Sequence, residues 1–136
     1  MNVNPYIGIP YKDHGASHAG VDCYGLLRLW YKEQRGVDLP DYGPNYDDAA
    51  NTAGAAALMA FVIGSKEQGW WRVPEGKSWQ VGDALLLRVG RWACHCGIYL
   101  GADFLHSLKG RNSTLEALDS LTWRNNVVGA YRWTGA

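Results

Sequence analysis

The feature that most limits the fold of this chain is a change in the spacing of its apolar residues near position 70. Before that point, residues 23–34 carry apolar side chains at helical spacing, and residues 49–60 form an alanine-rich run that also favours a helix. After it, short segments rich in β-favouring residues are separated by Gly, Asn or Asp. These segments are 70–73, 84–89, 95–100, 104–108, 113–117 and 127–133.

Helices followed by strands predict an α+β domain, in which N-terminal helices pack on an antiparallel sheet of five to six strands. The length of 136 residues suits one domain with one modest core, and 47% of the residues are hydrophobic. No linker, internal repeat or charged low-complexity tract divides the chain. We therefore predict a single domain over residues 1–136.

Charge and composition exclude several kinds of partner. Thirteen Lys and Arg residues balance thirteen Asp and Glu residues, and the absence of a basic stripe predicts that nucleic acid is not a partner. No segment has the length and apolarity of a membrane span, and residues 1–5 lack the features of a secretory signal. We predict a protein made in the cytoplasm without a signal peptide, and no membrane partner. Three cysteines make a disulfide framework improbable.

A cysteine stands at the predicted start of the first helix. Residues 20–26 read GVDCYGL, so Asp22 precedes the helix and Cys23 falls in its first turn. A thiol attacks well only as the thiolate, and the positive end of the helix dipole favours that form. Asp22 is interpreted as a helix cap or a substrate contact, because a carboxylate acting beside the thiol would raise its pKa. Cys23 is thus a candidate nucleophile.

Two histidines lie on neighbouring predicted strands. His95 and His106 flank a turn at 101–103, and a hairpin of these strands would place their side chains next to each other. One imidazole could then accept the thiol proton while the other orients it, which is the logic of a catalytic triad. Taken singly, each histidine would instead be interpreted as a surface or core residue.

The residues around His95 also raise the question of a metal. Cys94 and Cys96 flank it, but neighbours on a strand point to opposite faces, so one ion could not easily bind all three. A zinc site would need a fourth ligand as well. The alternative, that both cysteines are small buried apolar residues, is favoured. We predict neither a metal nor another cofactor.

Five motifs occur in order along the chain. They are Tyr11 ahead of the cysteine, GVDCYGL at 20–26, Gly82-Asp83 opening a strand, HCGIYLG at 95–101 and FLH at 104–106. With these motifs, the chain resembles the NlpC-type cell-wall cysteine peptidases, papain-like enzymes that cut the stem peptide of bacterial peptidoglycan, and among them the phage-tail and gene-transfer-agent branch. The resemblance covers nearly the whole chain.

The resemblance implies a role for each matched residue. Cys23 would be the nucleophile at the N-terminus of a helix in a papain-like fold, His95 the general base and His106 the third polar member. It also implies that the Tyr11 hydroxyl and the Cys23 backbone N–H help to hold the oxyanion or the substrate carbonyl. Many members have Ser directly after the nucleophile, contacting the peptide near the scissile bond. Here Tyr24 stands in that place, which changes the expected substrate preference.

Three functions follow as alternatives. The first is a peptidase or amidase that hydrolyses peptidoglycan stem peptides through a thioester, carried in a phage virion tail and acting at the cell wall, with other tail proteins as partners. The second is a thiol acyltransferase on the same fold, in which only the acceptor differs. The third is a catalytically silent tail assembly module. Retention of Cys23, His95 and His106 favours the first two.

Overall fold

A six-stranded antiparallel sheet forms the body of the molecule. The computed structural model describes residues 1–41, 56, 59, 60, 62, 63 and 66–135. The strands run in the order β3-β8-β4-β5-β6-β7, and every neighbouring pair is antiparallel. Their bounds are β3 Trp70–Arg72, β4 Ala84–Val89, β5 Trp92–Tyr99, β6 Asp103–His106, β7 Thr114–Ala117 and β8 Val127–Trp133. The predicted antiparallel sheet is confirmed, with six strands.

The two largest differences between the predicted and the observed strand boundaries have a clear reason. β5 begins at Trp92 rather than at residue 95, because Gly90 adopts a left-handed φ of 63° and a two-residue turn lets Trp92 pair with Val89. β6 ends at His106 rather than at residue 108, where its pairing with β5 and β7 stops. A small hairpin of β1 Ala16–Ser17 and β2 Gly20–Val21 was not predicted.

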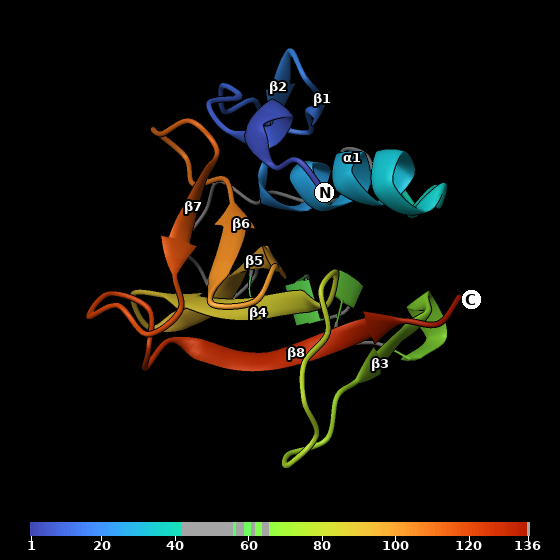
Figure 1. The fold of residues 1–136 in the computed structure, drawn as a ribbon, viewed down its shortest axis with the longest axis vertical. Coiled ribbons are helices and arrows are strands. Elements are labelled where there is room, and N and C mark those ends of the chain that lie inside the picture. The colour runs from blue at the N-terminus through green and yellow to red at the C-terminus, as the bar shows by residue number, and fades with distance from the viewer. Residues whose placement is uncertain (42–55, 57–58, 61, 64–65, 136) are drawn as a thin grey trace.

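The helix α1 Cys23–Arg35 packs on the sheet (Figure 1). Asp22 caps its first turn, and Gly36 ends it with a left-handed φ of 66°, which glycine adopts without strain. The helix is therefore confirmed at the predicted place. The predicted helix over 49–60 falls largely outside the described residues. Short 3-10 turns lie at Asn4–Tyr6 and Lys66–Gln68.

The two faces of the sheet carry two different apolar clusters. The face toward α1 presents Cys96, Ile98 and Leu105, which pack with Leu27 and Trp30 of the helix. The opposite face has its own cluster of six buried residues, which are Val73, Leu85, Leu87, Phe104, Trp123 and Ala130. Successive residues of β5 and β6 therefore serve different cores, as strand alternation requires.

The start of α1 depends on a close contact between backbone segments. A Cβ at position 25 would overlap the carbonyl oxygen of Gly15, and Gly15 also accepts a hydrogen bond from the Asp22 amide at 3.2 Å. Only glycine at position 25 leaves room for this carbonyl. The loop before β1 and the first helical turn are thus held together at the start of α1.

Gly25→Ala separates this packing requirement from helix propensity. Propensity alone predicts that alanine stabilises a helix by about 1 kcal/mol relative to glycine. The overlap is with backbone rather than with a flexible side chain, so we expect a net loss of about 2–4 kcal/mol in the free energy of unfolding. Urea unfolding of the variant measures this loss, with the exposed Lys32→Ala as control. An unchanged or higher midpoint would show that the loop yields easily.

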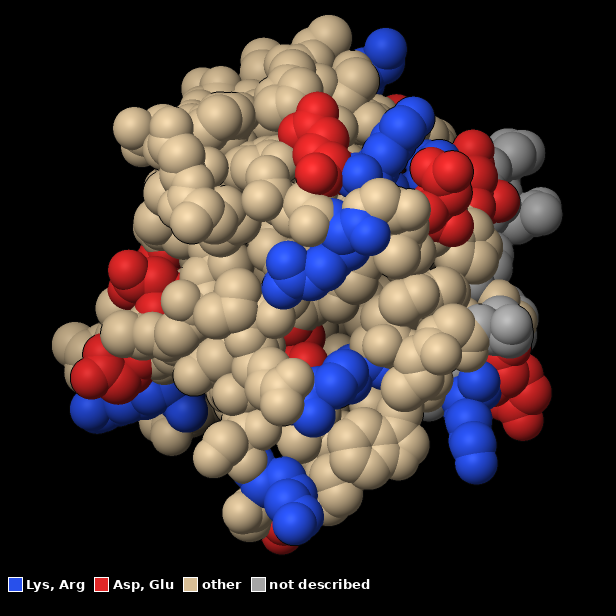
Figure 2. Space-filling view, turned by 45° about the vertical axis from the view of Figure 1, so that its right-hand side comes forward, with Lys and Arg blue, Asp and Glu red and all other residues tan. Residues whose placement is uncertain are grey.

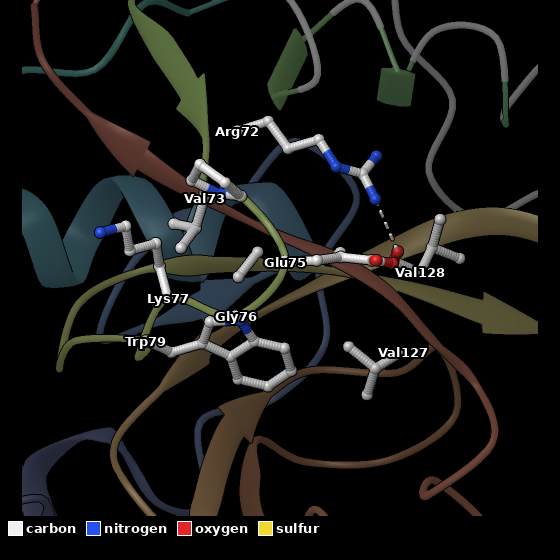
Figure 3. Close-up of a pocket in the computed structure, with 11 residues that line it drawn as sticks. Arg72, Val73, Glu75, Gly76, Lys77, Trp79, Val127 and Val128 are labelled. Atoms are coloured by element: carbon white, nitrogen blue, oxygen red, sulfur yellow. Dashed lines mark hydrogen bonds between the residues drawn. The ribbon is translucent and has the colours of Figure 1, made fainter.

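The loop between β3 and β4 folds back over β8 and encloses a small cavity of about 270 Å³ (Figure 3). The Arg72 guanidinium lies beside Gly129 and donates to the carbonyl of Val128 at 3.3 Å and to the Tyr131 hydroxyl at 3.2 Å. A Cβ at position 129 would come within 3.2 Å of the guanidinium carbon, so the glycine makes room for it. Arg72 thereby ties the edge strand to β8.

On the face shown in Figure 2, acidic and basic side chains are interspersed rather than segregated. Among the described residues, no helix is both long and apolar enough to span a membrane.

Candidate active site

Cys23 is the first residue of α1 and is buried, with 3% of its surface exposed. The strand β2 ends two residues earlier, at Val21, and the chain turns directly into the helix. The first amides of a helix have no partners within the helix, and the helix dipole adds partial positive charge there. The sulfur of Cys23 is therefore placed where a thiolate is stabilised.

Asp22 uses both of its carboxylate oxygens on backbone amides. Oδ1 accepts from the Gly25 amide at 2.6 Å, and Oδ2 accepts from the His14 amide at 2.6 Å. The residue is completely buried. Its position agrees with the interpretation of Asp22 as a helix cap, while a contact with substrate stays a prediction.

The two tyrosines predicted at the site lie on different sides of Cys23 in the chain. Tyr11 forms an isolated parallel bridge with Val21, so its backbone runs beside the segment that leads into the helix. Tyr24 is buried in the core on α1, and its hydroxyl donates to the carbonyl of Pro40 at 2.6 Å. In this position Tyr24 anchors the segment after α1, and its role toward substrate remains a prediction.

His95 and His106 meet on the face of the sheet that lies away from the helix body. His106 pairs with Gly97 across the β5–β6 ladder, which makes His95 its diagonal neighbour on the same face. The Nε2 of His95 lies 2.9 Å from the Nδ1 of His106. A Cβ at Gly97 would come within 3.3 Å of the His106 Cβ, so glycine lets the imidazole cross between the strands. The predicted contact between the two histidines is present.

Two further residues extend this pair. The Nε2 of His106 lies 2.5 Å from the Oε2 of Glu116 on β7, and the same oxygen accepts from the indole N–H of Trp123 at 3.0 Å. The Trp123 ring also lies edge-on to His106, with ring centroids 5.2 Å apart. Sequence analysis missed both residues. The alternation within 113–117 does not reveal that Glu116 faces His106, and Trp123 lies between two predicted strands, where no pattern marks it.

The hydrogen bonds assign a tautomer to each ring. A carboxylate only accepts, so Glu116 receives the proton carried on Nε2 of His106. The Nδ1 of neutral His106 must then accept, so the Nε2 of His95 donates to it. This leaves the Nδ1 of neutral His95 with a free lone pair. His95 is thus arranged as a proton acceptor at that atom.

Burial keeps these rings neutral. The pKa of His95 is held well below its usual value, first by burial and then by the nearby His106. Burial also lowers the pKa of His106, while the hydrogen bond to Glu116 and its negative charge act in the opposite direction. Neutral imidazole is the form that a general base requires.

The start of α1 is tied to the end of β6. The Ser107 hydroxyl, one residue beyond His106, donates to the carbonyl of Val21 at 3.3 Å. The β5–β6 ladder ends at the pair Gly97 and His106, whereas β5 itself continues back to Trp92, so His95 lies on a stretch of β5 that extends past the end of β6. The contact between His95 and the Cys23 thiol stays a prediction.

The comparison with known families decides which group these features represent. The model of the NlpC/P60 family matches residues 8–132, nearly the full length of the chain. This chain belongs to the NlpC/P60 family. The resemblance to the NlpC-type family found in the sequence is thereby confirmed, and the phage-tail and gene-transfer-agent branch stays a prediction.

Named NlpC/P60 relatives align with the chain at low identity. The murein DD-endopeptidase MepS/murein LD-carboxypeptidase of Escherichia coli is 22% identical over 126 residues, which is 92% of this chain and 56% of the relative. The probable endopeptidase NlpC homologue of Haemophilus influenzae is 23% identical over 130 residues, covering 95% of this chain and 58% of that protein. The chain thus spans somewhat more than half the length of these relatives.

Solved NlpC/P60 structures share the fold. The NlpC/P60 domain of the peptidoglycan hydrolase SagA superposes with a TM-score of 0.57 at 21% identity, covering 96% of this chain and 92% of that domain. A protein of the family from Staphylococcus aureus, described as similar to a lipoprotein, gives a TM-score of 0.62 at 24% identity, covering 96% of this chain and 38% of that protein. These likenesses confirm the predicted papain-like fold.

The two cysteines beside His95 behave as core residues. Cys96 is fully buried and packs with the cluster beneath α1, on the face opposite His95. Cys94 is also buried, and burial raises the pKa of its thiol. Both observations agree with their interpretation as small apolar residues. In the described part of the chain, no three His, Cys, Asp or Glu side chains converge in a way that could hold a metal ion.

Proposed function

We propose that this NlpC/P60 protein is a cysteine peptidase that hydrolyses an amide bond in the stem peptides of peptidoglycan. The observation that carries the proposal is the buried pair of His95 and His106, hydrogen bonded at 2.9 Å, in a chain whose Cys23 is the first residue of a helix. The names of the Escherichia coli and Haemophilus influenzae relatives, both endopeptidases, support the reaction and the substrate.

In the proposed mechanism the Cys23 thiol lies within about 4 Å of the free Nδ1 of His95. That nitrogen takes the thiol proton, and the sulfur attacks the carbonyl carbon of the substrate to form a tetrahedral oxyanion. His95 then gives the proton to the leaving amine, and the C–N bond breaks to leave a thioester on Cys23. A water molecule, deprotonated by His95, attacks the thioester and releases a carboxylate.

Three groups would assist these steps. The backbone N–H of Cys23 and the Tyr11 hydroxyl are proposed to hold the oxyanion, where each donor is typically worth about 2.7–4 kcal/mol. The bridge between Tyr11 and Val21 supports this role, because it places the two segments side by side. His106 would hold the His95 ring in the orientation and tautomer that keep Nδ1 available.

The finer setting rests on the resemblance of the motifs to the phage-tail and gene-transfer-agent branch. We propose that the protein is made in the bacterial cytoplasm, travels in a virion tail with other tail proteins and acts at the cell wall.

Digestion of purified sacculi tests the reaction. Sacculi incubated with the protein should release fragments that mass spectrometry identifies by a new amino and a new carboxyl terminus within the stem peptide, with sacculi kept without protein as control. Added amines appearing on the new carboxyl group would identify an acyltransferase instead. Absence of any product from folded protein would favour a silent assembly module.

A further inference from the structure

We propose that Glu116 is a fourth member of the site, a positioning residue that sets the tautomers of both imidazoles and stabilises the positive charge that His95 gains when it takes the Cys23 proton. The proposal rests on the proposed function for the identity of the base and the nucleophile. It adds a residue that the motifs do not contain and that acts through His106 without touching the substrate.

The first argument is the continuity of the hydrogen bonds. His95, His106 and Glu116 come from three adjacent strands, and each makes a diagonal contact with the next on one face of the sheet. The two contacts measure 2.9 Å and 2.5 Å. With both rings neutral, the Glu116 carboxylate allows one arrangement of protons in which each donor meets an acceptor: His95 donates to His106, and His106 donates to Glu116. Without it, His106 could carry its proton on Nδ1 and oppose the proton of His95.

The second argument is that the Glu116 carboxylate is itself held in place. Its Oε2 accepts from the Trp123 indole at 3.0 Å as well as from His106. Trp123 is 4% exposed, and Phe104 stacks on His106 with centroids 4.4 Å apart. The aromatic rings shield the His106 end of this line from water, while 28% of the Glu116 side chain is exposed. The buried end strengthens the interaction between the charge at Glu116 and one arriving on the imidazoles.

The third argument is the balance of charges around His106. Glu116 on β7 is the acidic group that faces it, His95 on β5 is titratable, and Arg111 in the connection between β6 and β7 opposes a positive ring. Leu87 lies across from His95 on β4 and is apolar. Within the described residues, Glu116 is therefore the group that offsets burial and the charge of Arg111 when the thiol proton moves onto His95.

Glu116→Gln tests the charge, because glutamine keeps an oxygen that can accept from His106. The readout is the rate of alkylation of Cys23 by iodoacetamide between pH 5 and 10, with mass mapping to separate Cys23 from Cys94 and Cys96. In the wild type, Glu116 offsets the charge that the neutral His95 gains when it takes the Cys23 proton, so labelling should already be substantial near neutral pH. In the variant, labelling should begin only at a higher pH, where the Cys23 thiol ionises without help from His95; an ordinary thiol has a pKa of about 8.5.

We expect the pH–rate curve of Glu116→Gln to move upward by about one pH unit and the rate at pH 6.5 to fall about tenfold. Peptidase activity should fall by about ten- to a hundredfold, in kcat rather than KM. Glu116→Asp, which restores the charge, should recover part of both. The exposed Asp119→Asn removes one acid three residues away and should leave the curve unchanged.

Several outcomes would overturn the proposal. An unshifted alkylation curve for Glu116→Gln, or an equal shift for Asp119→Asn, would reject it while leaving the peptidase proposal intact. A wild type that cuts no muropeptide but shows the expected shift would reject the peptidase proposal alone. If Glu116→Gln does not fold, Trp123→Phe is used instead, because it removes the indole donor to Glu116. The pH–rate curve of alkylation should then move in the same direction by a smaller amount. An unmoved curve would reject the proposal.

Discussion

Cys23→Ala should reduce hydrolysis of a purified stem peptide to the uncatalysed rate. The thiol is the atom that forms the thioester, and alanine offers no nucleophile in its place. Removing the nucleophile of a serine peptidase costs about 10⁶-fold in kcat, and we expect a loss of that order. The measurement is the initial rate of release of the new amino terminus, followed by mass spectrometry of the acid-quenched wild type for an acyl group on Cys23.

Cys94→Ala is the matched control for this variant. Cys94 is buried like Cys23 but lies on the strand β5 rather than in the first turn of α1. Its replacement should lower stability by about 1 kcal/mol, as expected for a small cavity, and leave the rate nearly unchanged. Equal losses in the two variants, or an acyl group trapped on Cys94 or Cys96, would contradict the assignment of the nucleophile.

His95→Ala should lower the rate by at least about 10²–10⁴-fold, which is the usual contribution of a general base. The structure places the free lone pair on Nδ1 of His95, because Nε2 is engaged by His106 at 2.9 Å. Alanine removes the proton acceptor altogether. The rate on a purified stem peptide measures the loss, with circular dichroism to establish that the variant is folded.

His106→Asn serves as the comparison and should retain measurable activity. The asparagine carbonyl can still accept a hydrogen bond from Nε2 of His95, so the base keeps its tautomer although the link to Glu116 is weakened. If His106→Asn were the less active of the two, the roles of base and orienting residue would have to be exchanged. If both matched the wild type, the peptidase proposal would fail.

Most of the sheet could be predicted because its strands follow local rules. Alternation and β-favouring residues located all six segments, and the errors of one to three residues arose where pairing with a neighbour set the end. The β1–β2 hairpin was missed because two-residue strands carry no pattern. The glycine at position 25 was read as part of a motif, while the contact with Gly15 that requires it joins two segments through space.

The candidate site, like the sheet, was predicted where it depends on neighbours in the chain and missed where it depends on contacts between distant segments. Cys23 at the start of a helix and two histidines on adjacent strands followed from the residues themselves, since capping and alternation depend on near neighbours. The sequence alone therefore determined the helix, its cap at Asp22 and the face shared by His95 and His106. Only the tertiary structure decided that Glu116 and Trp123 complete the line of hydrogen bonds and that Ser107 holds the start of α1 at the end of β6. Those contacts depend on strand register and on how the helix packs, which arise from many weak interactions between distant residues and leave no periodic signal in the chain.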